Sequence, residues 1–180
     1  TWVLNGVKNF ITNAKEADVA IVYAIVDPEK KHNGIAAFIV EKERKGYSVS
    51  KLENKLGING SSTGQIVLEN VEVPEENLIQ GEDSGFKIAM NTLDGGRIGI
   101  GTQAVGIGRA ALEEAWAYSL EREAFGKPIA HLGAIQIHLS DMATQLDAAR
   151  LLCRNAARLK DLGVSYGREA SQAKLFASEA

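Results

Sequence analysis

The stretch 135–159, IQIHLSDMATQLDAARLLCRNAARL, decides the fold class of the second half of the chain. Its apolar residues recur at steps of four and three, so a helix would gather them into one stripe about seven turns long. The stripe consists of Ile135, Leu139, Met142, Leu146, Ala149, Cys153, Ala156 and Leu159. Because so long a helix must bury its apolar stripe against partners, the pattern predicts a helical bundle.

Helical spacing continues on both sides of this stretch. Residues 86–123 are predicted to form an earlier helix, and Gly126-Lys127-Pro128 is predicted to break the chain before the long one. A further helix is predicted to start near Ser165, and the last residues, 174–180, continue as a helix with neither a Gly nor a Pro stop signal. Since the chain also starts at Thr1 rather than at Met, we expect it to be part of a longer protein.

Before about residue 84 the sequence changes to short β-type runs separated by turns. The runs are 19–26, 35–40, 47–51 and 66–73. The first is apolar throughout, as expected of a strand buried on both faces. Asn5-Gly6 predicts a hairpin turn after residues 2–4. Strands of this length and spacing predict a small antiparallel β-barrel or sandwich, and hence an α+β chain divided into residues 1–83 and 84–180.

Composition excludes several classes of protein. The 20 Lys and Arg residues against 23 Asp and Glu residues give a net charge of −3, which argues against a nucleic-acid binder or a protein held on an anionic membrane. No apolar run approaches the roughly 20 residues of a membrane span, so we expect no membrane insertion. The single cysteine, Cys153, excludes an internal disulfide and a cysteine-rich zinc site, and it favours a reducing compartment. His32, His131 and His138 lack metal-ligand spacing, so no metal is expected.

Two glycine-rich segments, 99–104 and 106–111, match the dinucleotide-binding fingerprint of nicotinamide enzymes. That fingerprint binds a pyrophosphate only at a turn from a strand into a helix, whereas residues 86–93 are predicted to be helical. We therefore expect these glycines to allow close helix packing, and we disfavour a nicotinamide-dependent Rossmann enzyme.

Phe10-Ile11-Thr12 is a candidate cofactor contact. In a strand, Phe10 and Thr12 would share one face and Ile11 would point to the other. An aromatic ring and a hydroxyl on one face could meet the face and the edge of a flat cofactor. The same pair is also common in half-buried strands that bind nothing.

Asp94-Gly95-Gly96-Arg97 places a carboxylate and a guanidinium three residues apart on a helix, near enough to pair. The two glycines weaken the helix by about 1 kcal/mol each relative to alanine. That cost indicates the close approach of a ligand or of another backbone at a helix crossing, and both explanations stay open.

Arg122 stands near the end of the predicted helix, close to Phe125. Its guanidinium suits phosphate oxygens. The alternative is a cation that is simply favoured at a helix C-terminus.

Taken in order, these segments resemble the acyl-CoA dehydrogenase family, and within it the short-chain or butyryl-CoA type. The resemblance covers essentially the whole chain and rests on the order and spacing of its motifs. These motifs are Gly6-Val7-Lys8-Asn9-Phe10-Ile11-Thr12-Asn13, Lys55-Leu56-Gly57 with Ser62-Thr63, Val71-Glu72-Val73-Pro74, Gly85-Phe86-Lys87, Leu93-Asp94-Gly95-Gly96-Arg97, Arg122-Glu123-Ala124-Phe125-Gly126-Lys127-Pro128, Ala134-Ile135-Gln136, Leu139-Ser140-Asp141-Met142-Ala143 and Ala173-Lys174.

The resemblance implies an FAD enzyme with a helical, a β and a second helical domain, of which this chain matches the middle β-domain and the first part of the C-terminal four-helix bundle. Family members oxidise an acyl-CoA thioester to the trans-2-enoyl-CoA, as in fatty acid β-oxidation. A glutamate removes the α-proton, the β-hydride goes to the flavin, and the electrons pass to electron-transfer flavoprotein. The family is usually tetrameric, with an FAD site shared between subunits. Bacterial cytoplasm and mitochondrial matrix are both open as locations.

The resemblance also implies roles for individual residues. Phe10 would pack beside the isoalloxazine, Ile11 would contact it through its backbone, and Thr12 would hydrogen-bond near flavin N5. Arg122 would reach the FAD pyrophosphate of a neighbouring subunit, with Phe125 packed near it.

Asp94 and Arg97 would line the acyl-CoA channel. Two positions depart from the family's pattern: Gly133 stands where a glutamine often contacts FAD, and Gly96 stands where isovaleryl- and long-chain types carry their catalytic glutamate. We therefore expect the base beyond Ala180, as in short- and medium-chain types, and we expect the 180 residues alone to be inactive. The acyl chain length stays open.

Two other functions stay open. A flavoprotein of the same superfamily could have other chemistry, such as that of an oxidase, or lack dehydrogenase activity. The chain could instead belong to a non-enzymatic oligomerisation or thioester-binding module without flavin. Flavin absorbance of the purified protein would distinguish the last of these from the others.

Overall fold

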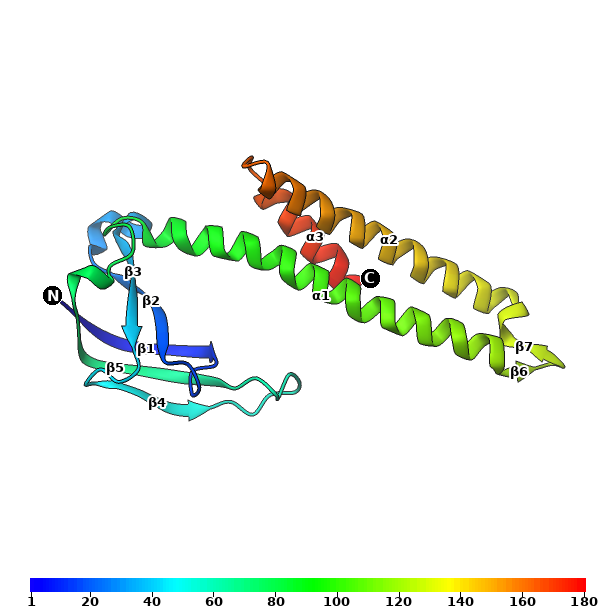
Figure 1. Cartoon of the computed structure of the whole chain (residues 1–180), viewed down its shortest axis with the longest axis horizontal. Helices are drawn as coiled ribbons and strands as arrows, with labels where there is room; N and C mark the ends of the chain where they lie inside the picture. Colours follow the sequence, from blue (N-terminus) through cyan, green and yellow to red (C-terminus); the bar gives the residue numbers. More distant parts are fainter. The chain divides into compact units, whose positions relative to one another are not determined.

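The computed structural model describes all 180 residues, which form two compact units, Thr1–Ala89 and Met90–Ala180. The longest helix, α1 (Gly85–Glu121), starts in the first unit and supplies the rest of its length to the second (Figure 1). None of the helices combines the length and the apolarity that a membrane span requires. Antiparallel sheets followed by helices confirm the predicted α+β class.

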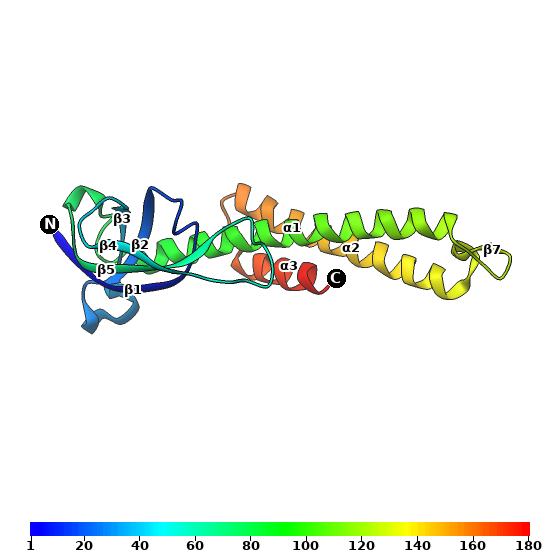
Figure 2. The ribbon, with the colours of Figure 1, turned by 90° about the horizontal axis from the view of Figure 1, so that it is seen from below.

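The first unit is built from two antiparallel sheets. β1 (Trp2–Thr12), β5 (Thr63–Val73) and β4 (Tyr47–Leu52) form one sheet in the order β1-β5-β4, and they lie side by side in Figures 1 and 2. β2 (Val19–Ile25) and β3 (Ile35–Glu41) form the second sheet. The two sheets stay separate rather than closing into a barrel.

The core of the first unit is formed by alternate residues of the two sheets. Phe38 is fully buried, and its ring lies 5.5 Å from that of Trp2 in a tilted arrangement. Ile11, near the end of β1, packs against this core and so fixes the part of the strand that carries Phe10 and Thr12. The remaining buried members are Leu4, Ala14, Val22, Ala36, Val40, Ile66, Leu68, Val71 and Val73.

The hairpin predicted at Asn5-Gly6 is wrong. β1 continues through both residues, and the ladder to β5 shifts its register between Leu4 and Gly6. The Asn5 side chain accepts a hydrogen bond from the Asn70 N–H at 2.8 Å. β1 pairs with the distant strand β5 both before and after this point. This pairing outweighs the local preference for a turn and leaves a β-bulge.

The apolar run 19–26 forms β2 as predicted, but the burial predicted for both of its faces is wrong. Val22 is buried against the core, whereas Val19, Ile21 and Ile25 are each more than half exposed. The reason is that β2 pairs only with β3, and this two-stranded sheet packs against the rest of the unit on one face.

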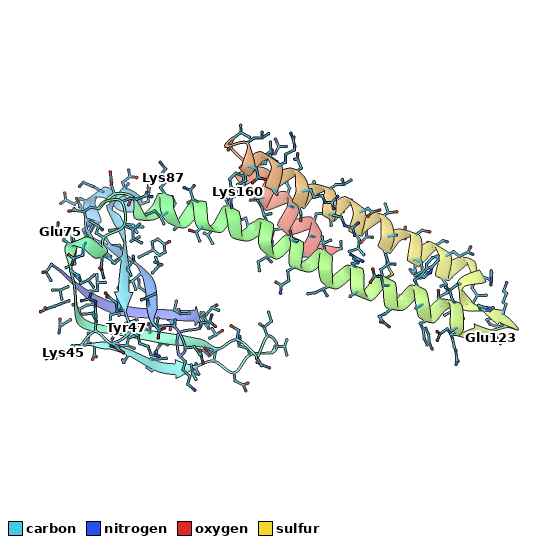
Figure 3. The ribbon with its side chains drawn as sticks, in the orientation of Figure 1. Lys45, Tyr47, Glu75, Lys87, Glu123 and Lys160 are labelled. Atoms are coloured by element: carbon cyan, nitrogen blue, oxygen red, sulfur yellow. The ribbon has the colours of Figure 1, made fainter.

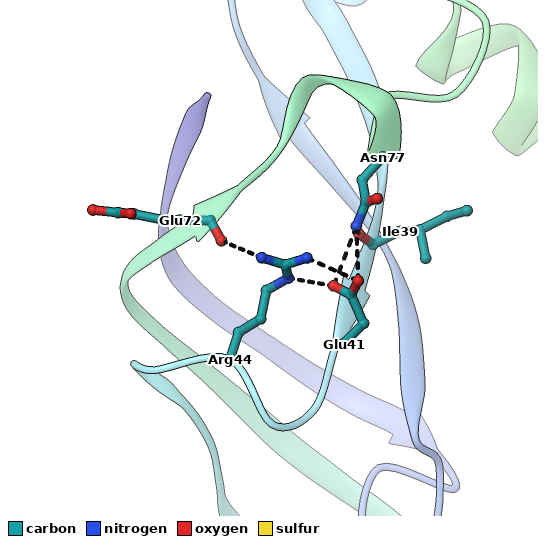
Figure 4. Close-up of polar contacts among 5 residues, drawn as sticks. All are labelled: Ile39, Glu41, Arg44, Glu72 and Asn77. Atoms are coloured by element: carbon teal, nitrogen blue, oxygen red, sulfur yellow. Dashed lines mark hydrogen bonds and ion pairs between the residues drawn. The ribbon is translucent and has the colours of Figure 1, made fainter.

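A polar cluster ties the turn after β3 to the short helical turn η2 (Glu75–Asn77), as Figure 4 shows. Arg44 donates through Nε and Nη2 to the Glu41 carboxylate, the latter bond measuring 2.8 Å, and through Nη1 to the Glu72 carbonyl at 3.1 Å. Asn77 Nδ2 donates to the Ile39 carbonyl at 2.8 Å and to Glu41 at 3.2 Å. The hydrogen bonds from Arg44, more than any other contact, lower the pKa of Glu41 from 4.5 to about 2.

This cluster predicts a specific sensitivity to acid. Because the folded state favours ionised Glu41, its contribution to stability is complete above pH 4.5 and is lost as the pH falls towards about 2. Glu41→Gln should lower stability at neutral pH and flatten the acid dependence. Denaturant unfolding at several pH values measures the effect, with the exposed neighbour Glu43 replaced by Gln as the control. Equal acid dependence in wild type and Glu41→Gln would contradict this role.

The second unit begins with the long part of α1 and then turns sharply. β6 (Glu123–Ala124) and β7 (Lys127–Pro128) form a small hairpin, followed by the turn η3 (Ile129–His131). The break predicted at Gly126-Lys127-Pro128 is this hairpin, in which Gly126 adopts a left-handed conformation with φ of 74°.

The helices predicted from the periodicity are confirmed. After the hairpin, α2 (Gly133–Asp161) returns alongside α1, and α3 (Gly167–Glu179) packs against α2 (Figures 1 and 2). The stripe predicted on α2 lies in the core of this unit. The buried hydrophobic residues are Leu139, Leu146, Ala149, Cys153 and Ala156 of α2, Val105 of α1, and Ala170, Ala173 and Ala177 of α3.

The glycine-rich segments lie inside α1 with no strand before them, as predicted. A Cβ on Gly101 would lie 3.0 Å from Cys153 Sγ, and one on Gly108 would lie 2.5 Å from Leu146 Cδ2. Both glycines therefore let α2 approach α1 closely, and the strand-to-helix turn of a dinucleotide fingerprint is not formed.

Candidate functional site

Phe10, Ile11 and Thr12 lie at a bulge near the end of β1. Asn9 and Phe10 together oppose the single residue Gln65 of β5, and Phe10 has a left-handed φ of 58°. This conformation is rare for a bulky residue and is found where the surrounding structure imposes it, often at functional sites. The Phe10 ring is 73% exposed and Thr12 is exposed, while Ile11 packs inward. The bulge thus leaves an aromatic ring and a hydroxyl facing outward.

The loop of residues 53–62 braces this end of β1. The Asn13 N–H donates to the Ser62 carbonyl at 2.9 Å, and Ser61 Oγ donates to Asn13 Oδ1 at 3.1 Å. Lys55 Nζ holds the loop itself, donating to the carbonyls of Ile58 and Ser61 at 2.9 and 2.6 Å. The sequence motif marks Lys55 and Ser62, but nothing local in the sequence reveals that their role is to support the neighbouring strand.

Asp94 and Arg97 form the ion pair predicted from their spacing. Arg97 Nη1 lies 2.5 Å from Asp94 Oδ1, and the two side chains are 41% and 26% exposed, respectively. The Asp94 carboxylate is thereby paired with the Arg97 guanidinium. The guanidinium keeps further N–H donors for an outside group.

Helix packing does not account for both glycines between these residues. A Cβ on Gly95 would lie 3.4 Å from Lys160 Nζ, but one on Gly96 would meet nothing within 4 Å. Gly96 therefore weakens α1 by about 1 kcal/mol without any close approach by another part of this chain. The open space beside it is available to a ligand.

Gly96→Ala is expected to raise the free energy of unfolding by about 0.5–1 kcal/mol, since alanine favours the helix and its methyl group meets no neighbour. The matched control is Gly108→Ala, whose methyl group would collide with Leu146. This variant should raise the free energy of unfolding by less than Gly96→Ala does, or lower it. Urea denaturation of both variants measures the difference. A loss of stability in Gly96→Ala would show that another part of the protein fills this space.

Arg122 and Phe125 present their side chains at the opposite end of α1. The Arg122 N–H donates to the Tyr118 carbonyl at 2.9 Å, and its own carbonyl accepts from the Ile129 N–H at 2.8 Å. The backbone is thus fixed while the guanidinium is exposed and the Phe125 ring is 91% exposed. At a rise of 1.5 Å per residue, Arg122 lies about 37 Å from Arg97 along the helix. One chain therefore does not bring these two groups together.

The other reactive side chains have structural surroundings. The buried Cys153 packs in the helical core, and burial raises the pKa of its thiol, so it is protonated and unreactive at neutral pH. The His32 ring stacks at a tilt on Phe86, 5.2 Å away. No cluster of three or more His, Cys, Asp or Glu side chains is arranged to hold a metal ion. Gly133 opens α2 with free space around it.

Family comparisons cover nearly the whole chain. A model described as "Acyl-CoA dehydrogenase, C-terminal domain" matches residues 83–180, and one described as "Acyl-CoA dehydrogenase, middle domain" matches residues 1–71. The chain is 50% identical over 179 residues to an acyl-CoA dehydrogenase of Bacillus subtilis, covering 99% of this chain and 47% of the relative. It is 48% identical over 180 residues to the mitochondrial short-chain specific acyl-CoA dehydrogenase of Rattus norvegicus, covering 100% and 44%. An acryloyl-CoA reductase (NADH) of Anaerotignum propionicum is 47% identical, with 99% and 45% covered.

Solved structures share the fold. Butyryl-CoA dehydrogenase from Megasphaera elsdenii matches with a TM-score of 0.94 at 47% identity, covering 98% of this chain and 46% of that one. A structure described as PigA with FAD and proline matches with a TM-score of 0.94 at 30% identity, covering 98% and 46%. A chain in a study of the electron transferring flavoprotein of Acidaminococcus fermentans matches at 0.93 and 50%, covering 98% and 47%. The chain spans about half the length of the relatives it matches. Both family models and these relatives agree, and the chain belongs to the acyl-CoA dehydrogenase family.

Proposed function

We propose that the protein containing this chain is an FAD-dependent acyl-CoA dehydrogenase that oxidises a short-chain acyl-CoA to the trans-2-enoyl-CoA. The observation that carries the proposal is the outward-facing aromatic ring and hydroxyl at the bulged end of β1, in a chain about half identical to short-chain acyl-CoA dehydrogenases. Residues 1–83 would serve as the middle β-domain and residues 84–180 as part of the C-terminal helical domain.

The side chains present fit FAD. Phe10 offers an exposed ring to the flat isoalloxazine, and Thr12 offers a hydroxyl to its polar edge, with the backbone of Ile11 between them. The exposed Arg122 fork suits a pyrophosphate, and the Phe125 ring lies exposed in the turn that follows. FAD, when bound, supplies the hydride acceptor, and the residues of the chain supply its orientation.

The placement of these groups supports an oligomer. Asp94 and Arg97 at one end of α1 and Arg122 and Phe125 at the other are too far apart for one substrate-binding site. We therefore assign the Arg122 end to the FAD of a neighbouring subunit, in a homo-oligomer that is a tetramer in this proposal. The sites would be complete only in the assembled protein.

The substrate side of the site uses Arg97 and the space at Gly96. Arg97 would donate to polar groups of the acyl-CoA, while the open position at Gly96 leaves room for the acyl thioester. Since Asp94 is held by Arg97 and position 96 carries no carboxylate, the base that removes the α-proton would be a glutamate outside residues 1–180. A dry, apolar site would raise the pKa of that glutamate and suit it to the task. The 180 residues alone would not catalyse the reaction.

The electrons would leave the protein to electron-transfer flavoprotein. A matching chain at 50% identity comes from a study of such a flavoprotein, which supports this partner. Relatives occur both in bacteria and in mitochondria. The proposed location is accordingly the bacterial cytoplasm or the mitochondrial matrix.

A second candidate is the reverse reaction, the reduction of an enoyl-CoA. It is favoured by the 47% identity to a relative named acryloyl-CoA reductase (NADH). The same side chains would bind the saturated and the unsaturated thioester, since both carry the same CoA and carbonyl. The direction would then be set by the redox partner rather than by residues of this chain.

Product analysis tests the proposal. The purified protein is incubated with butyryl-CoA and electron-transfer flavoprotein or an artificial electron acceptor, and the thioesters are analysed by mass spectrometry. The expected product has lost two hydrogens and carries a trans-2 double bond. Turnover only of an enoyl-CoA in the presence of a reductant would favour the second candidate, and no conversion in either direction would contradict both.

A further inference from the structure

The start of α3 lies directly against the Asp94 carboxylate. A Cβ built on Gly167, the first residue of α3, would lie 2.8 Å from Asp94 Oδ2 and 3.4 Å from its Cγ. Real Cβ atoms essentially never show a contact shorter than 3.0 Å, so the 2.8 Å contact would force a shift. Only a residue without a side chain therefore leaves the carboxylate in the place that it occupies.

The start of α3 is an electrostatically favourable place for a carboxylate. The N-cap residue of α3, Tyr166, makes no side-chain cap, and Ala170 N–H donates to the Tyr166 carbonyl at 2.8 Å as the first bond of the helix. The amides before Ala170 thus precede the helical ladder and form the positive end of the helix. The Asp94 carboxylate lies beside this end of α3 and accepts a hydrogen bond from the Arg97 guanidinium.

The last turn of α2 reaches the same place. Lys160, near the end of α2 (Figure 3), carries its Nζ to within 3.4 Å of the position that a Cβ on Gly95 would occupy. The end of α2 and the start of α3 therefore both lie beside the segment of α1 that carries the Asp94–Arg97 pair.

We propose that Gly167 is a positioning residue for the substrate, because it admits the Asp94 carboxylate against the start of α3 and so fixes the orientation in which Arg97 meets the acyl-CoA. This inference rests on the proposed function. Gly167 itself touches no substrate. In Gly167→Ala the added methyl group displaces the end of a flexible side chain rather than backbone, so the protein folds while Arg97 loses its fixed partner.

A double-mutant cycle in the FAD-loaded protein tests the proposal. Gly167→Ala is expected to raise the KM for butyryl-CoA about tenfold with a smaller change in kcat, and to add nothing further in an Asp94→Ala background. Gly106→Ala adds a methyl group in open space on α1 and is expected to leave KM unchanged. An unchanged KM in Gly167→Ala, or an equal rise with and without the Asp94 carboxylate, would overturn the proposal.

Thermal unfolding gives a readout that does not depend on activity. It is measured on wild type, Gly167→Ala, Asp94→Ala and the double variant. The Tm shift caused by Gly167→Ala is expected to differ between the wild-type and Asp94→Ala backgrounds, because the collision needs the carboxylate. If the Tm shifts of Gly167→Ala and Asp94→Ala were additive while the enzyme was active, the positioning role of Gly167 would be overturned but the proposed function would stand. A wild-type protein that neither binds nor oxidises acyl-CoA would overturn the proposed function and, with it, the role of Gly167.

Discussion

Arg122→Ala is expected to weaken the binding of FAD by about 10- to 150-fold, the equivalent of the roughly 1.5–3 kcal/mol that a hydrogen bond to a charged group contributes. The guanidinium is exposed while the backbone of Arg122 is anchored to Tyr118 and Ile129, so truncation removes the charged fork without disturbing the turn. Titration of the apoprotein with FAD, followed by flavin fluorescence, measures the affinity.

Two variants make this result specific. Arg109→Ala removes an exposed arginine of α1 that pairs with Glu113 at 2.7 Å, and it is expected to leave FAD affinity unchanged. Arg122→Lys keeps the charge but loses the planar fork, so its affinity should fall between those of wild type and Arg122→Ala. Equal FAD affinity in wild type and Arg122→Ala would remove Arg122 from the cofactor site.

Phe38→Ala is expected to lower the free energy of unfolding by about 3–5 kcal/mol, the usual cost of truncating a buried phenylalanine. Its side chain is 0% exposed and lies in the core that also holds Trp2 and Ile11. Loss of the ring removes apolar contacts and leaves a cavity beneath the strand that carries the candidate cofactor residues. Urea denaturation at neutral pH measures the change.

The adjacent residue of β3 provides the control. Ile39 points to the other face of the strand and is 39% exposed, so Ile39→Ala is expected to cost within about 1 kcal/mol. If Phe38→Ala and Ile39→Ala lowered the free energy of unfolding by the same amount, the sheet would not be packed on the face that the structure shows.

The helical half of the fold could be predicted from the sequence because helical periodicity is a local signal. The stripe from Leu139 to Ala156 identifies both the helix and the residues that it buries. The packing role of Gly101 and Gly108 also followed, because a helical context excludes the turn that a dinucleotide site needs.

The β half could be predicted only in part, because its details depend on residues far away in the sequence. Asn5-Gly6 is a strong turn signal, yet pairing with β5 turns it into a bulge. The apolar run of β2 identifies a strand, but its burial depends on which elements cover the sheet. Neither the bulge nor the burial of β2 is encoded in the local sequence of the strand concerned.

The candidate site shows the same division. The spacing of Asp94 and Arg97 was sufficient to predict their ion pair, since residues three apart on a helix are neighbours. The left-handed conformation of Phe10 arises at a bulge between β1 and β5, which are distant in sequence. The contact of Gly167 with Asp94 likewise involves two distant segments, α3 and α1. No local pattern marks them, so they required the structure.

The most direct test of FAD-dependent acyl-CoA oxidation is the visible absorption spectrum of the purified protein, before and after anaerobic addition of butyryl-CoA. We predict the bands of oxidised flavin and their bleaching on addition of the thioester. Bands that persist with butyryl-CoA and with longer and branched acyl-CoAs, or a protein that takes up no flavin even after reconstitution with FAD, would contradict the proposed function.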